Sequence, residues 1–248
     1  MQASPRVVLA SLSGESNADW ARAASAYADL AVLGGIAIDE ESRAAARELV
    51  ARDRNEFLPD EPLAFVDRQL ESLADDPILA GFNVRSATVE PVAEAAAVCA
   101  AHDAILEVNA HCRQEELCAA GCGETLLRDT DRLCEYVAAA AGEGATVSVK
   151  IRAEVTGVDL STTATRLEDA GADVLHVDAM DSESVVGVLA DATDCYVVAN
   201  NGVRGRESVY EYLEYGADAV SVGRPSDDPR VLGRVRDAVD RWFDAEGR

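Results

Sequence analysis

Lys150 and Arg152 are two residues whose types and spacing suggest chemistry. Lys150 is the only lysine in the sequence, because every other member of the 22 lysines and arginines is an arginine. The two cations flank Ile151 at the end of the apolar run TVSVKI, and alternate residues of a strand face the same side. An anionic or electron-rich ligand would match this pair. The alternative is a structural ion pair with an acid such as Glu107 or Asp178.

Cys112 is a second candidate, in the segment that follows the apolar run AILEVN. A thiol near the end of a strand can act as a nucleophile, when its pKa is lowered, or as a proton donor. The alternative is a small apolar residue in a loop. The neighbouring His111 could serve as an acid, although a lone histidine in a loop is more commonly solvated than catalytic.

Two glycine-containing segments suggest a phosphate site. ANNGVRG contains Asn200 and Gly202, and VSVGRP contains Gly223 and Arg224. Backbone N–H groups at glycines and helix starts bind phosphates, and (β/α)8 barrels commonly place such a site after strands seven and eight. Ordinary left-handed turns are the alternative for both segments.

The pattern of the whole chain predicts a fold that gathers these residues. Short apolar runs bounded by turns alternate with helix-length segments, which is typical of parallel strands buried on both faces. Eight such units predict one (β/α)8 TIM barrel domain over residues 1–248, with a doubly wound sheet as the alternative. The predicted strands are residues 6–10, 30–38, 78–84, 104–109, 146–151, 173–179, 195–200 and 218–223. The predicted helices are residues 17–28, 40–51, 62–75, 89–101, 130–141, 160–170, 182–191, 206–215 and 229–243.

The charge of the chain is strongly acidic. Its 46 acidic residues against 22 basic ones give a formal charge of −24. This composition, with its single lysine, resembles that of halophilic archaeal proteins, which stay soluble at high ionic strength. An acid-rich interaction module is less favoured, because the acids are spread along the chain. No signal pattern and no apolar run of about 18 residues is found, so we expect a cytoplasmic protein.

The six cysteines do not indicate a disulfide framework, since a cytosol keeps thiols reduced. Cys112, Cys118 and Cys122 lie close together in the sequence. Their spacing fits no standard zinc or iron–sulfur motif, so we predict no metal site.

In this order, the candidate segments resemble the tRNA-dihydrouridine synthases, FMN-dependent barrels that reduce uridine in tRNA, and more distantly the dihydroorotate dehydrogenases. The resemblance runs from about Leu79 to Leu232. LEVNAHCRQEELCAAGCGETLLRD resembles the family's strand-end Asn, catalytic Cys and Gly-x-Gly segment. VSVKIR resembles its Lys-x-Arg strand, VVANNGV its Asn-Gly loop, and GADAVSVGR its closing Gly-Arg phosphate site.

The resemblance implies a role for each candidate. Lys150, also a catalytic candidate, would lie near the reactive edge of the flavin, and Asn109 and Arg152 would bind the substrate. Hydride would pass from the reduced flavin to C6 of the pyrimidine, Cys112 would supply the proton to C5, and NADPH or NADH would supply the electrons. The FMN-binding residues would be Asn83, Lys150, Asn200, Gly202, Gly223 and Arg224.

The sequence also departs from the family. His111-Cys112-Arg113 replaces its Gly-Cys-Pro, and Asp178-Ala179-Met180 stands where the family has His-x-Arg. We expect no C-terminal helical tRNA-binding domain, because the sequence ends soon after Gly223-Arg224. The expected substrate is therefore uridine in tRNA or a smaller pyrimidine. The alternatives are a small-molecule flavoenzyme of the dihydroorotate dehydrogenase type, or a phosphate-ligand barrel without flavin chemistry.

Overall fold

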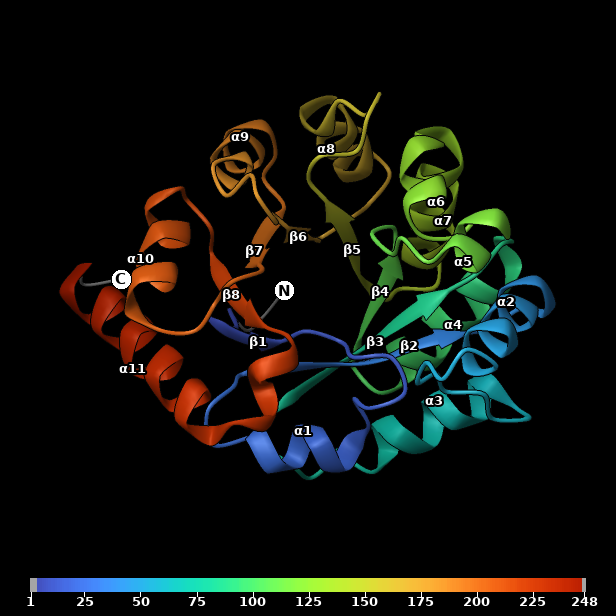
Figure 1. Cartoon of the computed structure of the whole chain (residues 1–248), viewed down its shortest axis with the longest axis horizontal. Coiled ribbons are helices and arrows are strands. Elements are labelled where there is room, and N and C mark those ends of the chain that lie inside the picture. The colour runs from blue at the N-terminus through green and yellow to red at the C-terminus, as the bar shows by residue number, and fades with distance from the viewer. Residues whose placement is uncertain (1–3, 247–248) are drawn as a thin grey trace.

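The computed structural model describes residues 4–246, and it contains a closed barrel of eight parallel strands surrounded by helices (Figure 1). The strands pair in chain order, and the last pairs with the first. They are β1 (Val7–Leu9), β2 (Leu30–Ala37), β3 (Leu79–Arg85), β4 (Ile105–Asn109), β5 (Thr146–Arg152), β6 (Val174–Asp178), β7 (Tyr196–Asn200) and β8 (Ala219–Val222). The predicted (β/α)8 TIM barrel is confirmed, and each strand lies at its predicted place.

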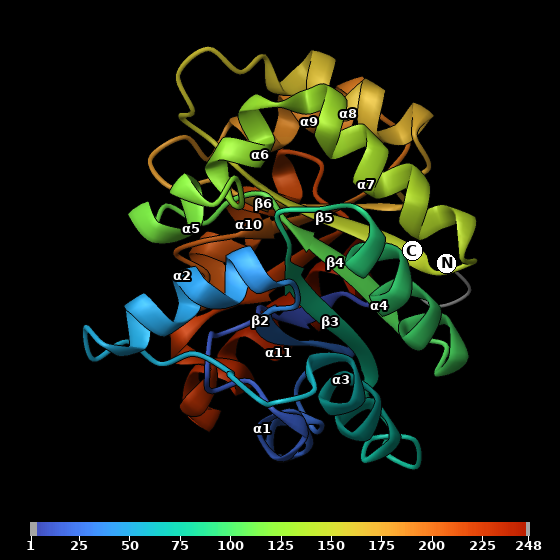
Figure 2. The ribbon, with the colours of Figure 1, turned by 90° about the vertical axis from the view of Figure 1, so that its right-hand side faces the viewer.

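Helices cover the outside of the barrel, and α4 and α7 lie side by side next to β4 (Figure 2). The predicted helices are α1 (Ala18–Ala24), α2 (Glu40–Val50), α3 (Pro62–Glu71), α4 (Glu90–Ala101), α7 (Thr130–Gly142), α8 (Leu160–Asp169), α9 (Val185–Ala192), α10 (Arg206–Glu214) and α11 (Pro229–Glu246). Three short elements were not predicted, because they are too short to show a helical period: α5 (Glu115–Ala119), α6 (Glu124–Arg128) and the 3-10 helix η1 (Arg224–Asp227).

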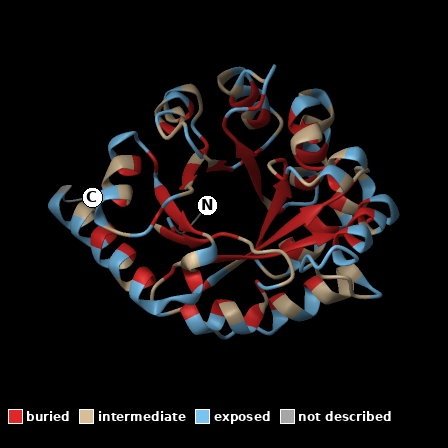
Figure 3. Ribbon diagram, in the orientation of Figure 1, coloured by how far each residue is buried: buried red, intermediate tan, exposed pale blue. Residues whose placement is uncertain are grey.

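Helix α8 illustrates how the sequence forms these units. The side chain of Asp159 accepts a hydrogen bond from the backbone N–H of Thr162, which caps the first turn. Leu167 is fully buried against the barrel, and Gly171 ends the segment with a φ of +106°, a value that favours glycine. The same division holds around the molecule, since the helices expose their outer faces and bury their inner ones (Figure 3). Within residues 4–246, no helix is long and apolar enough to span a bilayer.

The interior of the barrel changes character along its axis. Near the amino ends of the strands lies a cluster of buried aliphatic side chains, which we call the apolar layer: Val8, Leu30, Val32, Ile105, Val174, Val198 and Ala219. Further along the strands come buried polar side chains, which we call the polar layer: Asn83, Glu107, Ser148, His176 and Ser221. Residues two apart face the same way, so Glu107 and His176 follow Ile105 and Val174 on the inner face. The polar layer therefore lies directly beneath the mouth, the end of the barrel where the strands' carboxyl ends meet.

Candidate active site

Two adjoining cavities open at the mouth of the barrel. The first has a volume of about 340 Å³ and the second about 400 Å³, which lies within the range of small-molecule sites. They share a wall made of Ser11, His111, Asp178, Met180 and Arg224. This is the end of a (β/α)8 barrel at which enzymes of this fold carry their chemistry.

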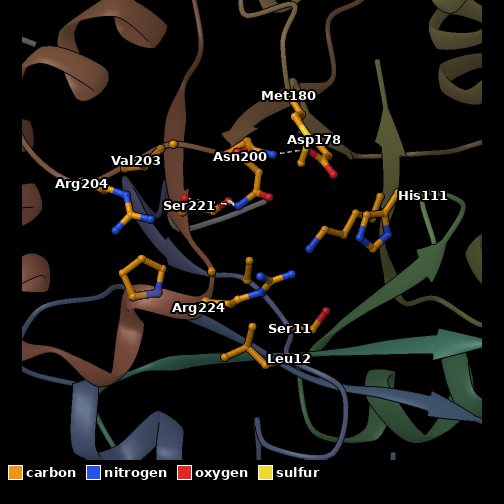
Figure 4. Close-up of a pocket in the computed structure, with 16 residues that line it drawn as sticks. Ser11, Leu12, His111, Asp178, Met180, Asn200, Val203, Arg204, Ser221 and Arg224 are labelled. Carbon is orange, nitrogen blue, oxygen red and sulfur yellow. Dashed lines mark hydrogen bonds between the residues drawn. The ribbon is translucent and has the colours of Figure 1, made fainter. Parts of the chain in front are cut away.

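The first cavity collects most of the predicted cofactor-binding residues. Lys150, Asn200, Gly202, Gly223 and Arg224 all line it. Figure 4 shows Arg224 pointing into this cavity from one side, with Asn200 across from it. The segments after β7 and β8 thus come together as predicted for a phosphate site, although their role in binding remains a prediction.

The backbone of these two glycine segments leaves space for a ligand. Gly202 has a φ of +66°, and no atom lies within 4 Å of the position that a Cβ atom would take there. The same position at Gly223 is also free of neighbours. Asn201 adopts a φ of +100°, which is rare for a residue with a side chain, and its amide donates to Asp178 Oδ1 over 2.8 Å. A held backbone turn with open space beside it fits a phosphate group.

Lys150 is buried at the wall of the first cavity, with 2% of its surface exposed. Burial lowers the pKa of its ammonium group, and the charges of Glu107 and Asp178 only partly oppose this. Within residues 4–246, its ammonium forms no hydrogen bond and no ion pair, so the structural ion pair with Glu107 or Asp178 is not formed. The donor set of this cavity, a buried cation beside open glycine backbone, fits the ring and phosphate of FMN.

The second cavity holds both predicted substrate-binding residues and Cys112, one of the two predicted catalytic residues, whereas the other, Lys150, lines the first cavity. Asn109, Cys112 and Arg152 line the second cavity, and five of its lining residues are arginines. Asn83 lines neither cavity and is fully buried, so the structure places it behind Asn109 and not at the cofactor wall. The predicted cofactor-binding residues other than Asn83 therefore line the first cavity, the predicted substrate-binding residues line the second, and their roles in binding remain predictions.

Cys112 is buried, and it is held by close backbone contacts. Its thiol contacts the side chain of Gln114, and burial raises the pKa of this thiol even though the nearby Arg85 opposes the shift. The thiol is consequently protonated at neutral pH, which suits a proton donor. Gly123 passes so close that a Cβ atom there would lie 2.4 Å from the carbonyl oxygen of Cys112. A glycine is thus required at position 123, the second glycine of the Gly-x-Gly segment, for packing against Cys112.

One half of the polar layer joins Asn200 to Glu107. The Asn200 amide donates to Ser221 Oγ over 2.7 Å, and Ser221 Oγ lies 2.7 Å from His176 Nε2. His176 Nδ1 lies 2.7 Å from Glu107 Oε2. A carboxylate can only accept, so Nδ1 carries the proton and Nε2 accepts from the serine hydroxyl.

The other half of the polar layer continues from Glu107 to the Cys112 loop. The Asn83 amide donates to Glu107 Oε1 over 2.7 Å, and the Asn109 amide donates to Asn83 Oδ1 over 2.8 Å. Asn109 Oδ1 then accepts from the backbone N–H of Cys112 over 3.2 Å. A continuous hydrogen-bonded chain therefore fixes Asn109, and through it the loop that carries the thiol.

Charge is arranged asymmetrically in this layer. Burial raises the pKa of Glu107, but its contacts with His176, the charge of Lys150 and the Asn83 amide outweigh burial and lower the pKa to about 2. Burial lowers the pKa of His176, and Glu107 only partly opposes this shift. At neutral pH the layer consequently holds one carboxylate, a neutral imidazole and the nearby ammonium of Lys150.

His111 lies in the wall shared by both cavities, where sequence reasoning favoured an ordinary solvated loop histidine. Burial, together with the charges of Lys150, His176, Arg85 and Arg152, holds its pKa well below the usual value. Its Nδ1 lies 3.1 Å from Asn109 Oδ1, so Nδ1 donates and Nε2 is left as an acceptor. The sequence did contain one indication of a role for His111, because this histidine replaces the glycine of the family's Gly-Cys-Pro motif.

Arg85 and Glu56 form a buried ion pair that the sequence did not reveal. Arg85 Nη1 lies 2.6 Å from Glu56 Oε2, and the two side chains are 4% and 2% exposed. Arg85 also contacts the Ser13 hydroxyl. Glu56 and Ser13 belong to the first 78 residues, where no motif pointed to the site.

The cysteines of the structure are all free thiols, and the three closest in sequence lie around the Cys112 loop. Cys118 Sγ lies 3.4 Å from the carbonyl oxygen of Cys112, and burial raises the pKa of Cys122 to about 12. Across the described part of the chain, no group of three or more His, Cys, Asp or Glu residues is placed to hold a metal ion.

Several solved structures share the architecture of this chain. A 2,3-dimethylmalate lyase of the PEP mutase/isocitrate lyase superfamily aligns with a TM-score of 0.60 and 14% identity, over 100% of this chain and 85% of that one. The tryptophan synthase complex from Pyrococcus furiosus aligns with a TM-score of 0.58 and 13% identity, over 96% and 98%. A FabK mutant from Thermotoga maritima also gives 0.58 and 13%, over 93% of this chain and 63% of that one. At such identities the likeness shows the fold alone.

Fold and site together define a (β/α)8 barrel with a polar, cationic double cavity at its mouth. Residues 66–245 match the family model described as dihydrouridine synthase (Dus), and the chain belongs to this family. An uncharacterized protein of Methanocaldococcus jannaschii, MJ0144, is 27% identical over 229 residues, which cover 88% of each protein. Membership supports flavin-dependent oxidoreductase chemistry of the dihydrouridine synthase type, since the family depends on FMN.

Proposed function

We propose that this protein is an FMN-dependent reductase of the C5–C6 double bond of a pyrimidine, which is either uridine in tRNA or a related smaller substrate. The observation that carries the proposal is the pairing of the two cavities. A buried cation without a protein partner, Lys150, stands beside open glycine backbone in one cavity. A protonated thiol, Cys112, stands in the adjoining one.

The residues of the first cavity would hold the cofactor. The backbone of Gly202 and Gly223, with the Arg224 side chain, would bind the phosphate, and Asn200 and Lys150 would contact the ring system. Asn200 donates to Ser221, so its amide oxygen is left to accept from a ligand N–H. The compact ammonium of Lys150 favours negative charge at the edge of the ring, where a broad guanidinium would not fit in the same way. The chemistry that bound FMN supplies is hydride transfer, from NADPH or NADH to C6 of the pyrimidine.

The protein must then supply the proton that C5 gains. Cys112 is the donor in this proposal, because its thiol is protonated at neutral pH and its loop is anchored by Asn109. His111 Nε2 provides an acceptor for a ring N–H of the substrate. With one hydride at C6 and one proton at C5, the reduction is balanced.

A visible absorption spectrum of the protein, purified in high salt, tests the cofactor. We expect the flavin bands to be present, or to shift on addition of FMN as the ring enters the cavity. A protein that shows no bands and does not change the spectrum of added FMN would refute the proposal, and would favour a phosphate-ligand barrel without flavin chemistry.

Dihydrouridine in total tRNA from a strain that lacks the gene tests the substrate. A reduced level would identify tRNA as the substrate. An undiminished level, from a protein that carries flavin, would point to a small molecule and to the dihydroorotate dehydrogenase type of reaction.

A further inference from the structure

The second cavity reverses the charge of the rest of the molecule. The chain as a whole has 46 acidic and 22 basic residues, yet one carboxylate, Asp178, lines this cavity against five guanidinium groups. A recess of one charge sign with low-dielectric walls concentrates ions of the opposite sign. The arginines are Arg54, Arg85, Arg113, Arg152 and Arg224.

Arg152 is the most informative of them. Arg152 is 5% exposed, and its Nε donates a hydrogen bond to the carbonyl oxygen of Ala153 over 3.2 Å. Among residues 4–246, neither of its terminal nitrogens has a hydrogen bond or an ion pair. The terminal nitrogens are therefore left to bind a ligand in the cavity, and the planar fork that they form matches a carboxylate or phosphate bidentately.

The other arginines divide into two kinds. Arg85 is neutralised by Glu56 and belongs to the structure of the wall. Arg54, Arg113 and Arg224 are exposed, and in the described part of the chain their guanidinium groups form no ion pair. Arg113 follows Cys112 directly, so a charge on the substrate near Arg113 would lie close to the reacting atoms.

We infer, on the basis of the proposed pyrimidine reductase function, that the substrate is a small pyrimidine carrying a phosphate or carboxylate, and that Arg152 and Arg113 bind this anionic group. The surroundings of the cavity favour a compact anion over a nucleic acid. Exposed acidic residues, Glu154 and Asp181, follow β5 and β6 at the same end of the barrel. Nucleic acids are bound through many phosphates along a basic surface, whereas this chain has a formal charge of −24.

The test compares ligands that differ in charge at one fixed salt concentration. Uridine, uridine 5′-monophosphate, orotate and unmodified tRNA are titrated into the FMN-loaded protein, with calorimetry as the readout. We expect one of the two small anions to bind about tenfold or more tightly than neutral uridine. Preference for the monophosphate identifies a phosphate group, and preference for orotate identifies a carboxylate. Equal affinities for all three small ligands, or a tighter complex with tRNA, would overturn the inference.

Matched arginine variants assign the preference to the second cavity. Arg113→Gln and Arg152→Gln should bring the ratio of anion to uridine affinity close to one. Arg204→Gln is the control. Arg204, like Arg113, is an exposed arginine at the mouth, but it lines the first cavity and not the second. Arg204→Gln should leave the ratio of anion to uridine affinity unchanged, even if it weakens FMN binding. If the buried Arg152→Gln fails to fold, the exposed Arg113→Gln still decides, and an unchanged ratio in Arg113→Gln would contradict the assignment.

The outcome separates this inference from the proposed function, because calorimetry reports the anion and the visible spectrum reports flavin. A protein without flavin that still prefers the anionic pyrimidine refutes the reductase and keeps the anion site. A flavin-containing protein with no preference keeps the reductase and refutes the anion site.

Discussion

The two layers of the barrel interior differ although the same strands build both. Ile105 and Val174 belong to the apolar layer. The next inward-facing residue on each of their strands, Glu107 and His176, is ionisable. The apolar layer gains free energy by burial alone. The polar layer is held by hydrogen bonds and faces the cavities. The difference teaches that stability and function are separated along the axis, and each substitution below tests that separation.

The largest effect is expected in the apolar layer. Leu30 is 3% exposed and packs in the barrel interior, so Leu30→Ala should lower the free energy of unfolding by about 3 kcal/mol, through lost burial and the cavity left behind. Chemical denaturation measures this. FMN affinity of the folded variant should be unchanged, and a tenfold weaker affinity would show that the two layers are not separate.

The second effect concerns the mouth. Cys112→Ala should leave FMN binding intact and slow substrate reduction by about 10²-fold or more, a usual scale for the loss of a general acid. Stopped-flow reduction of the bound substrate gives the rate. Cys118→Ala is the matched control, since Cys118 lies beside the same loop but lines neither cavity. Unchanged turnover in Cys112→Ala would reduce Cys112 to a loop residue.

Lys150→Met should have opposite consequences for stability and function. Burial disfavours its charged form, so the variant without FMN should be more stable by about 1 kcal/mol, while its FMN affinity falls. Lys150→Arg keeps the charge and should gain no stability, but should bind and reduce FMN less well. Thermal unfolding and flavin titration measure both quantities. Normal flavin binding and reduction in Lys150→Arg would mean that the single lysine has no special role.

The last effect is a pH dependence of stability that arises from His176 in the polar layer and from His111 at the mouth. Burial lowers the pKa of His111 and of His176, so below about pH 6.5 the unfolded chain binds protons that the folded chain does not. The free energy of unfolding should therefore decrease as the pH is lowered below about 6.5, by at most about 1.4 kcal/mol per pH unit for each histidine. Denaturation curves at pH 7.5 and 5.5 measure the slope. His111→Gln should flatten this slope, and an unaltered slope would count against a partly buried, neutral His111.

The sequence predicted the strands well because their signal is local. Continuous apolar runs such as TVSVKI identify buried strands without knowledge of their neighbours. The two turns α5 and α6 were missed, since five residues show no helical period. The candidates that line a cavity, such as Lys150 and Gly202, could be found because they lie at or just after the carboxyl ends of predicted strands.

The supports of the site could not be found in the same way. Glu56 pairs with Arg85 although the two residues are far apart in the sequence, and no local sequence pattern predicts such a pair. The partners of His176, Glu107 and Ser221, lie on β4 and β8, each two strands away from β6 around the barrel. Asn83 was predicted at the cofactor, and only packing shows that it lies behind Asn109. Contacts across a barrel are set by register, which one sequence does not display.

Lys150 gives the protein a single internal chemical label. An amine-directed reagent can modify only this side chain and the α-amino group, because no other lysine competes with it. Its lowered pKa leaves more of the amine uncharged and reactive than an exposed lysine would have. The mass of the intact protein after labelling therefore distinguishes molecules whose first cavity is open from molecules in which a ligand covers Lys150. This measurement depends neither on turnover nor on flavin absorbance.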